Sequence, residues 1–472
     1  MSEPAPGNNG HPNNEAIQVL DLYQTAEKIY TRRLNGFFRR LQNWSWMPFL
    51  GAYFLIPWLQ IDGRPAMLFD LVERKFHVFW ITFWPQDFPL LAWLLIIAAF
   101  ALFTVTNLFG RVWCGFSCPQ TVFTQIFMAI EERFEGDRNR RIRLDNSPWG
   151  AQKIARKGGK LIAWLVVAFA TGLTFVGYFN PIGALSADLV SWSAHPAAVF
   201  WVAFFTLGTF VNAGFMREQI CKYVCPYARF QSVMFDSDTL VVSYNAARGE
   251  QRGSRRHDHQ RGSDGLGDCV DCTLCVQVCP TGIDIRDGLQ YECISCGLCI
   301  DACNAVMDKL HYPRGLISFT SENALLKGEP VRFLRPRFVG YVSAVTVMTL
   351  LFVYTLATRI PLEVDVLRDR DMLYRLRPDG AVENSYTVKI NNMDQRDHHY
   401  TIAVEGGPML AYTGQREVMI EAGEVGELLI RLTSSEPLSA ANIPISFVVS
   451  ERDQPTLSDR AESRFISPAP RR

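Results

Sequence analysis

Five long stretches without a charged residue dominate the pattern of hydrophobic and polar positions. They run over Trp44–Ile61, Phe88–Phe109, Leu161–Phe179, Pro196–Met216 and Phe338–Thr358. A bilayer core needs roughly 20 apolar residues in a helix, and one charge at a helix centre costs about 2.5–3.5 kcal/mol. We therefore predict five membrane-spanning helices rather than buried core helices of a large soluble protein. The first is the shortest, and Pro48 and Pro57 interrupt it.

Lys and Arg are unevenly distributed among the segments between these stretches. They gather before the first, between the second and third, and before the fifth, whereas residues 180–195 contain none. The loop after the first stretch departs from the pattern, with Arg64, Arg74 and Lys75. Because Lys and Arg favour the cytoplasmic side, we predict a cytoplasmic N-terminus and, after five crossings, an outer C-terminus. Residues 1–30 lack an apolar leader, so we expect no signal peptide.

The pattern of apolar and polar residues changes beyond the fifth stretch. Segments such as Tyr386–Ile390, Tyr400–Val404 and Glu427–Arg431 alternate or run apolar and β-branched, and Gly, Asn and Pro separate them. This pattern predicts a small antiparallel β-sandwich. Three of its residues have side chains that bind copper in other proteins, but an interaction module is the simpler interpretation; they are Met393, His398 and His399.

A Gly-, Arg- and Asp-rich segment, residues 244–267, precedes the cysteine-rich part of the chain. Its composition predicts a flexible tether. His257 and His259 lie in this charged run, where a solvated surface is the expected role and metal binding the alternative.

All twelve cysteines lie between Cys114 and Cys303, in tight runs. Such spacing in a reducing compartment indicates metal ligands rather than disulfides. The formal net charge of zero does not point to nucleic acid as a partner.

Two runs share the spacing Cys-x2-Cys-x2-Cys-x3-Cys, which is typical of bacterial proteins with two [4Fe–4S] clusters. In this pattern the fourth Cys of each run binds the other cluster. We therefore assign one cluster to Cys269, Cys272, Cys275 and Cys303, and the other to Cys293, Cys296, Cys299 and Cys279. Pro280 follows the first run, but Asn304 follows the second, which predicts a looser turn there. Zinc is the alternative occupant, although zinc sites usually pair two CxxC knuckles.

Two further pairs of cysteines have the form CxxxCP and follow the second and fourth stretches. They are Cys114 with Cys118, and Cys221 with Cys225. The matching positions predict an internal duplication, and on a helix residues i and i+4 share a face. Two facing pairs would form a four-sulfur site for copper or a further metal centre. A redox-active dithiol and plain packing of small apolar side chains are the alternatives.

The predicted fold class is thus a membrane α-helical protein of five spans with an inserted two-cluster ferredoxin domain and a C-terminal all-β Ig-like sandwich. Its parts are a cytoplasmic N-terminal segment (1–43), a four-span region with both CxxxCP motifs (44–243), a linker (244–267), the cytoplasmic ferredoxin domain (268–337), a fifth span (338–358) and an outer sandwich (359–472).

The chain resembles the cytochrome c oxidase accessory proteins of the FixG/CcoG type. The resemblance rests on residues 268–317 (DCVDCTLCVQVCPTGIDIRDGLQYECISCGLCIDACNAVMDKLHYPRGLI), the RGEQR of residues 248–252 and both CxxxCP motifs, together with the spans and outer domain. It covers nearly the whole chain apart from about the first 30 residues.

The resemblance implies a role in assembling a cbb-type oxidase in the bacterial inner membrane, by reducing Cu(II) to Cu(I) on the cytoplasmic side. It implies as partners an unidentified electron donor, membrane lipid, oxidase assembly factors and a copper exporter with chaperones. Two other functions compete with this one. The first is a quinol-linked electron conduit to a partner reductase, and the second is an assembly scaffold with purely structural clusters.

Overall fold

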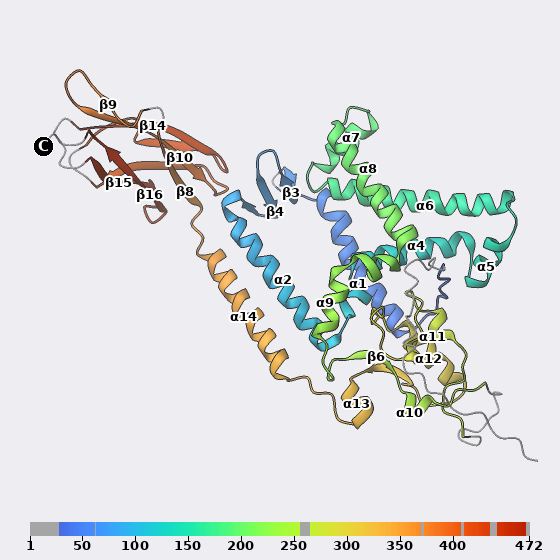
Figure 1. The fold of residues 1–472 in the computed structure, drawn as a ribbon. Helices are drawn as coiled ribbons and strands as arrows, with labels where there is room; N and C mark the ends of the chain where they lie inside the picture. Colours follow the sequence, from blue (N-terminus) through green and yellow to red (C-terminus); the bar gives the residue numbers. More distant parts are fainter. Residues whose placement is uncertain are drawn as a thin grey trace, which may run out of the picture.

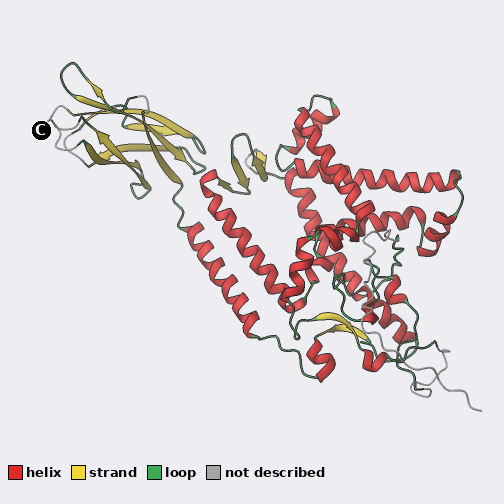
Figure 2. Cartoon of the chain, viewed as in Figure 1, coloured by secondary structure: helices red, strands yellow, loops and turns green. Residues whose placement is uncertain are grey.

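The computed structural model describes residues 28–61, 63–254, 265–369, 372–406, 410–434 and 441–468. The molecule is elongated, with a β-sandwich at one end, helices in the middle and the cysteine-rich domain at the other end (Figure 1). Figure 2 shows that most helix lies between these two ends, while the strands gather mainly in the sandwich.

Four helical segments are long and apolar enough to cross a membrane. They are Pro85–Phe109, which includes α2 (Phe88–Phe109); α6 (Ala151–Val176); Pro196–Met216, which comprises α8 (Pro196–Val211) and a π-helical turn; and α14 (Pro336–Ala357). Four of the five predicted spans thus correspond to candidate membrane helices.

The first predicted span differs. Helix α1 (Phe37–Leu55) begins seven residues before Trp44, and Arg39 and Arg40 lie in its first turn. Among the described residues it is not one of the helices apolar enough to span, so the structure has four candidate spans rather than five. Helix α1 still runs from the cysteine-rich domain toward the opposite end, where Tyr53 Oη donates to Thr171 O over 2.8 Å (Figure 1).

The candidate spans form two packed pairs. Helices α2 and α14 lie side by side in opposite directions (Figure 1), and the rings of Trp93 and Phe352 meet with centroids 6.2 Å apart. Helices α6 and α8 cross closely at Gly172, where a Cβ would lie 2.6 Å from Thr206 Oγ1. A small residue at such a crossing allows two membrane helices to approach.

Shorter helices and small sheets connect these elements. The helices are α3 (Val112–Phe116), α4 (Pro119–Glu135), α5 (Arg138–Asn146), α7 (Ile182–Val190) and α9 (Pro226–Met234). Toward the sandwich end, β1 (Gln60–Ile61) pairs with β2 (Arg64–Pro65), and β3 (Met67–Asp70), β4 (Lys75–Val78) and β5 (Ile81–Phe83) form an antiparallel sheet.

The cysteine-rich domain contains little regular structure. Its elements are β6 (Val241–Tyr244), α10 (Ala246–Gly249), α11 (Leu274–Gln277), α12 (Leu298–Lys309), β7 (Ile317–Thr320) and α13 (Glu322–Lys327). Strands β6 and β7 pair antiparallel and tie the segment before the cysteines to the segment after them.

The first half of the predicted tether is ordered, which corrects that prediction. Gly253 N donates to Cys269 O over 3.1 Å, and Arg248 forms a 2.5 Å ion pair with Asp268. These contacts hold residues 244–254 against the first cysteine run. The prediction of a flexible tether, which was based on composition alone, was therefore wrong for these residues. His257 and His259 lie outside the described residues.

The C-terminal domain is all-β, as predicted. Its strands are β8 (Leu362–Arg368), β9 (Arg375–Leu376), β10 (Val382–Asn392), β11 (His398–Glu405), β12 (Ala411–Thr413), β13 (Glu417–Ile420), β14 (Val425–Ser434), β15 (Asn442–Glu451) and β16 (Ser458–Ile466). One antiparallel sheet has the order β12-β14-β10-β8 with β9 beside β10, and the other has the order β13-β11-β15-β16. Alternate residues of β10 are buried, so its apolar face lines the core between the sheets.

Candidate functional site

The two cysteine runs have the same local geometry. Asp271 and Thr273 adopt positive φ in the first run, and Ser295 and Gly297 do so at the corresponding positions of the second. Each run then enters a short helix, α11 or α12, whose second residue is the third cysteine. The left-handed residues curl each Cys-x2-Cys-x2-Cys loop around an internal space.

Each predicted set of four cysteines lines one cavity. The first cavity holds about 380 Å³ of space not filled by atoms, and its lining includes Cys269, Cys272, Cys275 and Cys303. The second holds about 350 Å³, and its lining includes Cys279, Cys293, Cys296 and Cys299, together with Cys275. The structure thus places the fourth cysteine of each run with the first three of the other.

The chemistry of both cavities fits an iron–sulfur cluster. The remaining lining of the second cavity is largely apolar, with Ile283, Ile285 and Ile294, and soft thiolates suit iron–sulfur chemistry. Zinc sites usually pair two CxxC knuckles, whereas these eight cysteines form two interleaved sets, each around its own cavity. This arrangement favours two clusters over zinc.

Two thiols of the first cavity are held neutral when no metal is bound. Burial raises the pKa of Cys275 to about 11 and that of Cys303 to about 12. The buried guanidinium of Arg286 opposes the rise in the pKa of Cys275. Cluster binding needs thiolates, so loading either cavity must release protons.

The residue after each run has a different structural role. Pro280 follows Cys279 at the end of a short turn, whereas Cys303 lies in the interior of α12, which continues to Lys309. A proline at position 304 would break this helix. Asn304 instead accepts a hydrogen bond from Gly315 N over 3.1 Å, so the turn is anchored rather than loosened.

The CxxxCP motifs do not lie on continuous helices, contrary to the helical interpretation of their spacing. Cys114 lies in α3, and Cys118 caps α4, whose first residue is Pro119. Cys221 lies in a π-helical turn, and Cys225 caps α9, whose first residue is Pro226. The second cysteine of each motif therefore lies at a helix N-terminus.

The four CxxxCP thiols lie close enough to influence one another. Burial raises the pKa of Cys114 to about 12, and the nearby thiol of Cys118 in the same motif is the second-largest cause of this rise. Cys221 and Cys225 of the other motif raise this pKa further. The structure thus brings the two motifs together, while the binding of a metal there stays a prediction.

The first CxxxCP loop also touches the second cysteine cavity. A Cβ on Gly115 would lie 2.8 Å from Cys296 Cα and 2.7 Å from Ile294 O. Cys114 packs in the same apolar cluster as Cys296 and Cys299. Only glycine allows this approach of the two loops, and sequence reasoning missed it because the two segments are far apart in the chain.

Helix α1 and a buried ion network hold the motifs in place. Gln42 Nε2 donates to Gly115 O over 2.6 Å, and Ser45 Oγ donates to Phe116 O over 2.7 Å. Arg217, just before the second motif, binds the fully buried Glu131 of α4 over 2.7 Å. Because α4 follows the first motif, this ion pair ties the two motifs together.

Two of the three C-terminal-domain residues considered for copper have other partners. His398 is held between Glu451 and Asp394, with its ring nitrogens 2.6 and 2.9 Å from their carboxylates. Met393 Sδ instead accepts from Arg359 over 3.6 Å. These contacts give His398 and Met393 structural partners.

Comparison with known proteins places this arrangement in a family. The chain is 40% identical to the nitrogen fixation protein FixG of Rhizobium meliloti over 423 residues, covering 82% of this chain and 81% of that one. It is 40% identical to RdxB of Cereibacter sphaeroides over 418 residues, covering 85% and 87%. RdxA of the same organism is 38% identical over 440 residues, covering 89% and 92%. The chain belongs to the FixG/RdxA/RdxB family of ferredoxin-type proteins.

Family models also match separate parts of this FixG-family chain. A 4Fe-4S dicluster domain matches residues 216–322, a 4Fe-4S binding domain matches residues 90–136, and the Ig-like fold at the C-terminus of FixG matches residues 352–468. A crystal structure of a FixG-related protein from Vibrio parahaemolyticus is 32% identical, with a TM-score of 0.21, and covers 23% of this chain and 96% of that one. The chain is therefore an iron–sulfur electron-transfer protein with candidate membrane helices and an Ig-like domain. The two iron–sulfur models together contain all twelve cysteines.

Proposed function

We propose that this FixG-family protein reduces Cu(II) to Cu(I) on the cytoplasmic side of the membrane, in support of cbb-type oxidase assembly. The contact of the Cys114–Cys118 loop with Cys296 carries the proposal, because it puts the four CxxxCP thiols beside a cluster cavity. Thiolates prefer Cu(I) to Cu(II), so a copper ion bound by them is readily reduced.

The side chains have separate tasks in this proposal. The eight ferredoxin cysteines would hold two [4Fe–4S] clusters, which accept and give up single electrons when bound. Isoleucine side chains line the second cavity, and Cys118 and Cys225, each at a helix start, would bind copper together with Cys114 and Cys221. Each turnover consumes one electron from an external donor and converts one bound Cu(II) to Cu(I).

The proposed orientation has the cysteine-rich domain in the cytoplasm and the sandwich in the periplasm. In support, Arg32 N donates to Gln277 O over 2.7 Å, so the Arg-rich N-terminal segment lies at the cysteine-rich end. The sandwich lies at the far end of α14 (Figure 1). A copper exporter or chaperone would then meet the CxxxCP face, and oxidase assembly factors would meet the sandwich.

Cupric reduction by the purified full-length protein tests the proposal. We expect the fourfold variant Cys114→Ser, Cys118→Ser, Cys221→Ser and Cys225→Ser to lose most of the rate while keeping its iron and sulfide. The double variant Met393→Ala with His399→Ala serves as a control in the outer domain and should keep the rate. Undiminished reduction by the fourfold variant, with its clusters intact, would exclude the CxxxCP site.

One observation favours the quinol-linked conduit as a second candidate. An open cavity with about 1040 Å³ of space not filled by atoms lies between α2, α9 and α14, and its polar lining includes Asn107, Arg337 and Tyr341. Cluster reduction by an added quinol, abolished by Tyr341→Phe together with Arg337→Gln, would favour this function over copper reduction.

A further inference from the structure

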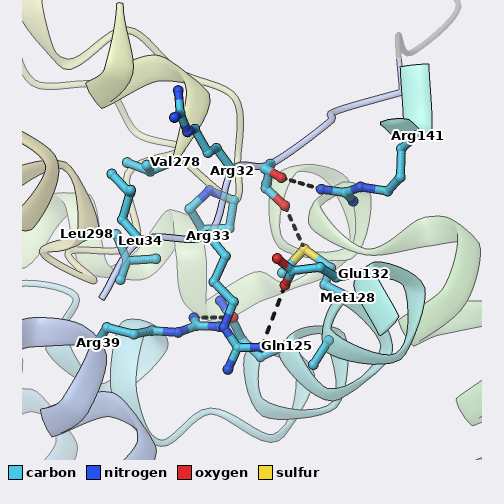
Figure 3. Close-up of a pocket in the computed structure, with 13 residues that line it drawn as sticks. Arg32, Arg33, Leu34, Arg39, Gln125, Met128, Glu132, Arg141, Val278 and Leu298 are labelled. Atoms are coloured by element: carbon cyan, nitrogen blue, oxygen red, sulfur yellow. Dashed lines mark hydrogen bonds and ion pairs between the residues drawn. The ribbon is translucent and has the colours of Figure 1, made fainter. Parts of the chain in front are cut away.

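A separate cavity lies where the N-terminal segment, α1 and α4 meet the cysteine-rich domain (Figure 3). It holds about 500 Å³ of space not filled by atoms. Its lining residues are Thr31, Arg32, Arg33, Leu34, Arg39, Gln125, Met128, Ala129, Glu132, Arg141, Val278, Pro280 and Leu298.

Positive charge exceeds negative charge in this cavity. Arg39 donates to two neutral partners, Gln125 Oε1 over 2.6 Å and Gln42 Oε1 over 3.2 Å, and its buried Nε has no partner. Within the described residues, no carboxylate forms an ion pair with Arg39. Arg33 lies close enough to repel Arg39 and pairs only loosely with Glu132, over 3.6 Å. In Figure 3, Arg39 reaches Gln125 and Arg33 reaches toward Glu132.

The other wall of the cavity is formed by residues that adjoin cysteines of the second cysteine cavity in the chain. Pro280 follows Cys279, and Leu298 precedes Cys299 in the chain. Arg39 lies within electrostatic range of Cys296. A charge bound beside Arg39 would therefore be felt by the cysteines that line the second cavity.

We propose that this cavity binds a small oxyanion through Arg33 and Arg39, and that its occupancy tunes the cluster held by Cys279, Cys293, Cys296 and Cys299. A planar guanidinium binds phosphate or carboxylate through paired hydrogen bonds. Glu132 is the one carboxylate that lines the cavity, and it lies within electrostatic range of Arg39 without forming an ion pair with it, so the guanidinium can still pair with a bound anion. Binding neutralises the positive charge near Cys296 and so lowers the reduction potential of that cluster. This inference goes beyond copper reduction and holds whatever metal occupies the CxxxCP site.

Calorimetric titration of the full-length protein with inorganic phosphate tests the site directly. Each charge-assisted hydrogen bond contributes about 1.5–3 kcal/mol, so Arg39→Gln should weaken binding by roughly ten- to a hundredfold. Arg33→Gln is a second variant, which keeps Arg39 and alters only an exposed residue. It should also weaken binding. Arg40→Gln removes the neighbouring charge outside the cavity and should leave the affinity unchanged. Absence of saturable binding, or equal affinity in Arg39→Gln and Arg40→Gln, would overturn the site.

Two further measurements identify the source of the anion and its effect. Adenosine monophosphate that binds at least as tightly as phosphate would indicate a nucleotide, whereas binding of phosphate alone would indicate the free ion. In an EPR-monitored redox titration, phosphate should lower one midpoint potential of the wild-type protein and none of Arg39→Gln. An unchanged wild-type potential at saturating phosphate would overturn the tuning role.

Discussion

The β-sandwich and the cysteine-rich domain fill their interiors in opposite ways. Tyr386, Ile390, Phe447 and Phe465 are fully buried in the sandwich, where side chains alone form the core. The cysteine-rich domain instead has two thiol-lined cavities between short helices, with about 380 and 350 Å³ of space not filled by atoms. Protein interiors are close-packed, and cofactors bound by the thiols would fill this space. The comparison indicates that one domain is stable by itself and the other depends on its cofactors.

The largest expected effect is the response to loss of iron. Removing the clusters by anaerobic chelation should unfold much of the cysteine-rich domain, because metal binding there is also folding free energy. Hydrogen exchange should show lost amide protection over residues 268–320 and unchanged protection over β10 and β15. Equal protection of residues 268–320 with and without iron would contradict the contrast between the domains.

A core deletion in the sandwich should produce the reverse pattern. Phe447→Ala should cost about 3–5 kcal/mol of the free energy of unfolding of the sandwich, because it leaves a cavity in a packed core. Denaturant titration followed by hydrogen exchange measures this, and the cluster EPR signals should not change. Met419→Ala, at a side chain that is 53% exposed, is the matched control and should cost less than about 0.5 kcal/mol. A cost for Phe447→Ala as small as that of the control would mean that the core is not packed as described.

A smaller effect concerns the pH dependence of the sandwich and rests on one side chain, His398. Burial by itself lowers the pKa of His398, but hydrogen bonds to Asp394 and Glu451 outweigh burial and raise it. A raised folded-state pKa stabilises the fold below the unfolded pKa of about 6.5, and this stabilisation is lost as pH rises through the folded value. The thermal midpoint of the sandwich should therefore fall as pH rises from about 6.5 through the higher folded-state pKa. His398→Gln should flatten this slope, and an equal slope in the variant would contradict the assignment.

Local patterns predicted the parts of the molecule that local geometry controls. The cysteine spacing places each run around a cavity, because a Cys-x2-Cys loop has few ways to turn its thiols inward. Alternation of apolar residues predicted strands such as β10, whose alternate residues are buried.

The errors arose where distant contacts or opposing local signals decide the structure. The prediction of a first span was wrong because the first turns of α1 are polar, although an apolar run follows them. The prediction of a flexible tether was wrong because contacts with Asp268 and Cys269 order residues 244–254. Pro119 and Pro226 are helix-start signals, so the breaks in the CxxxCP motifs could have been predicted. The contact of Gly115 with Cys296 could not, since it depends on the tertiary fold.

The iron and acid-labile sulfide content of the anaerobically purified protein tests the central claim most directly. Two clusters held by interleaved ligands and a separate four-thiol site predict about eight iron atoms per chain, four for each cluster. The fourfold CxxxCP serine variant should keep all of them. A 4Fe-4S binding domain matches residues 90–136, and this match defines the result that would contradict the account. About twelve iron atoms in the wild-type protein, falling to about eight in the variant, would contradict the account and assign a third cluster to the CxxxCP cysteines.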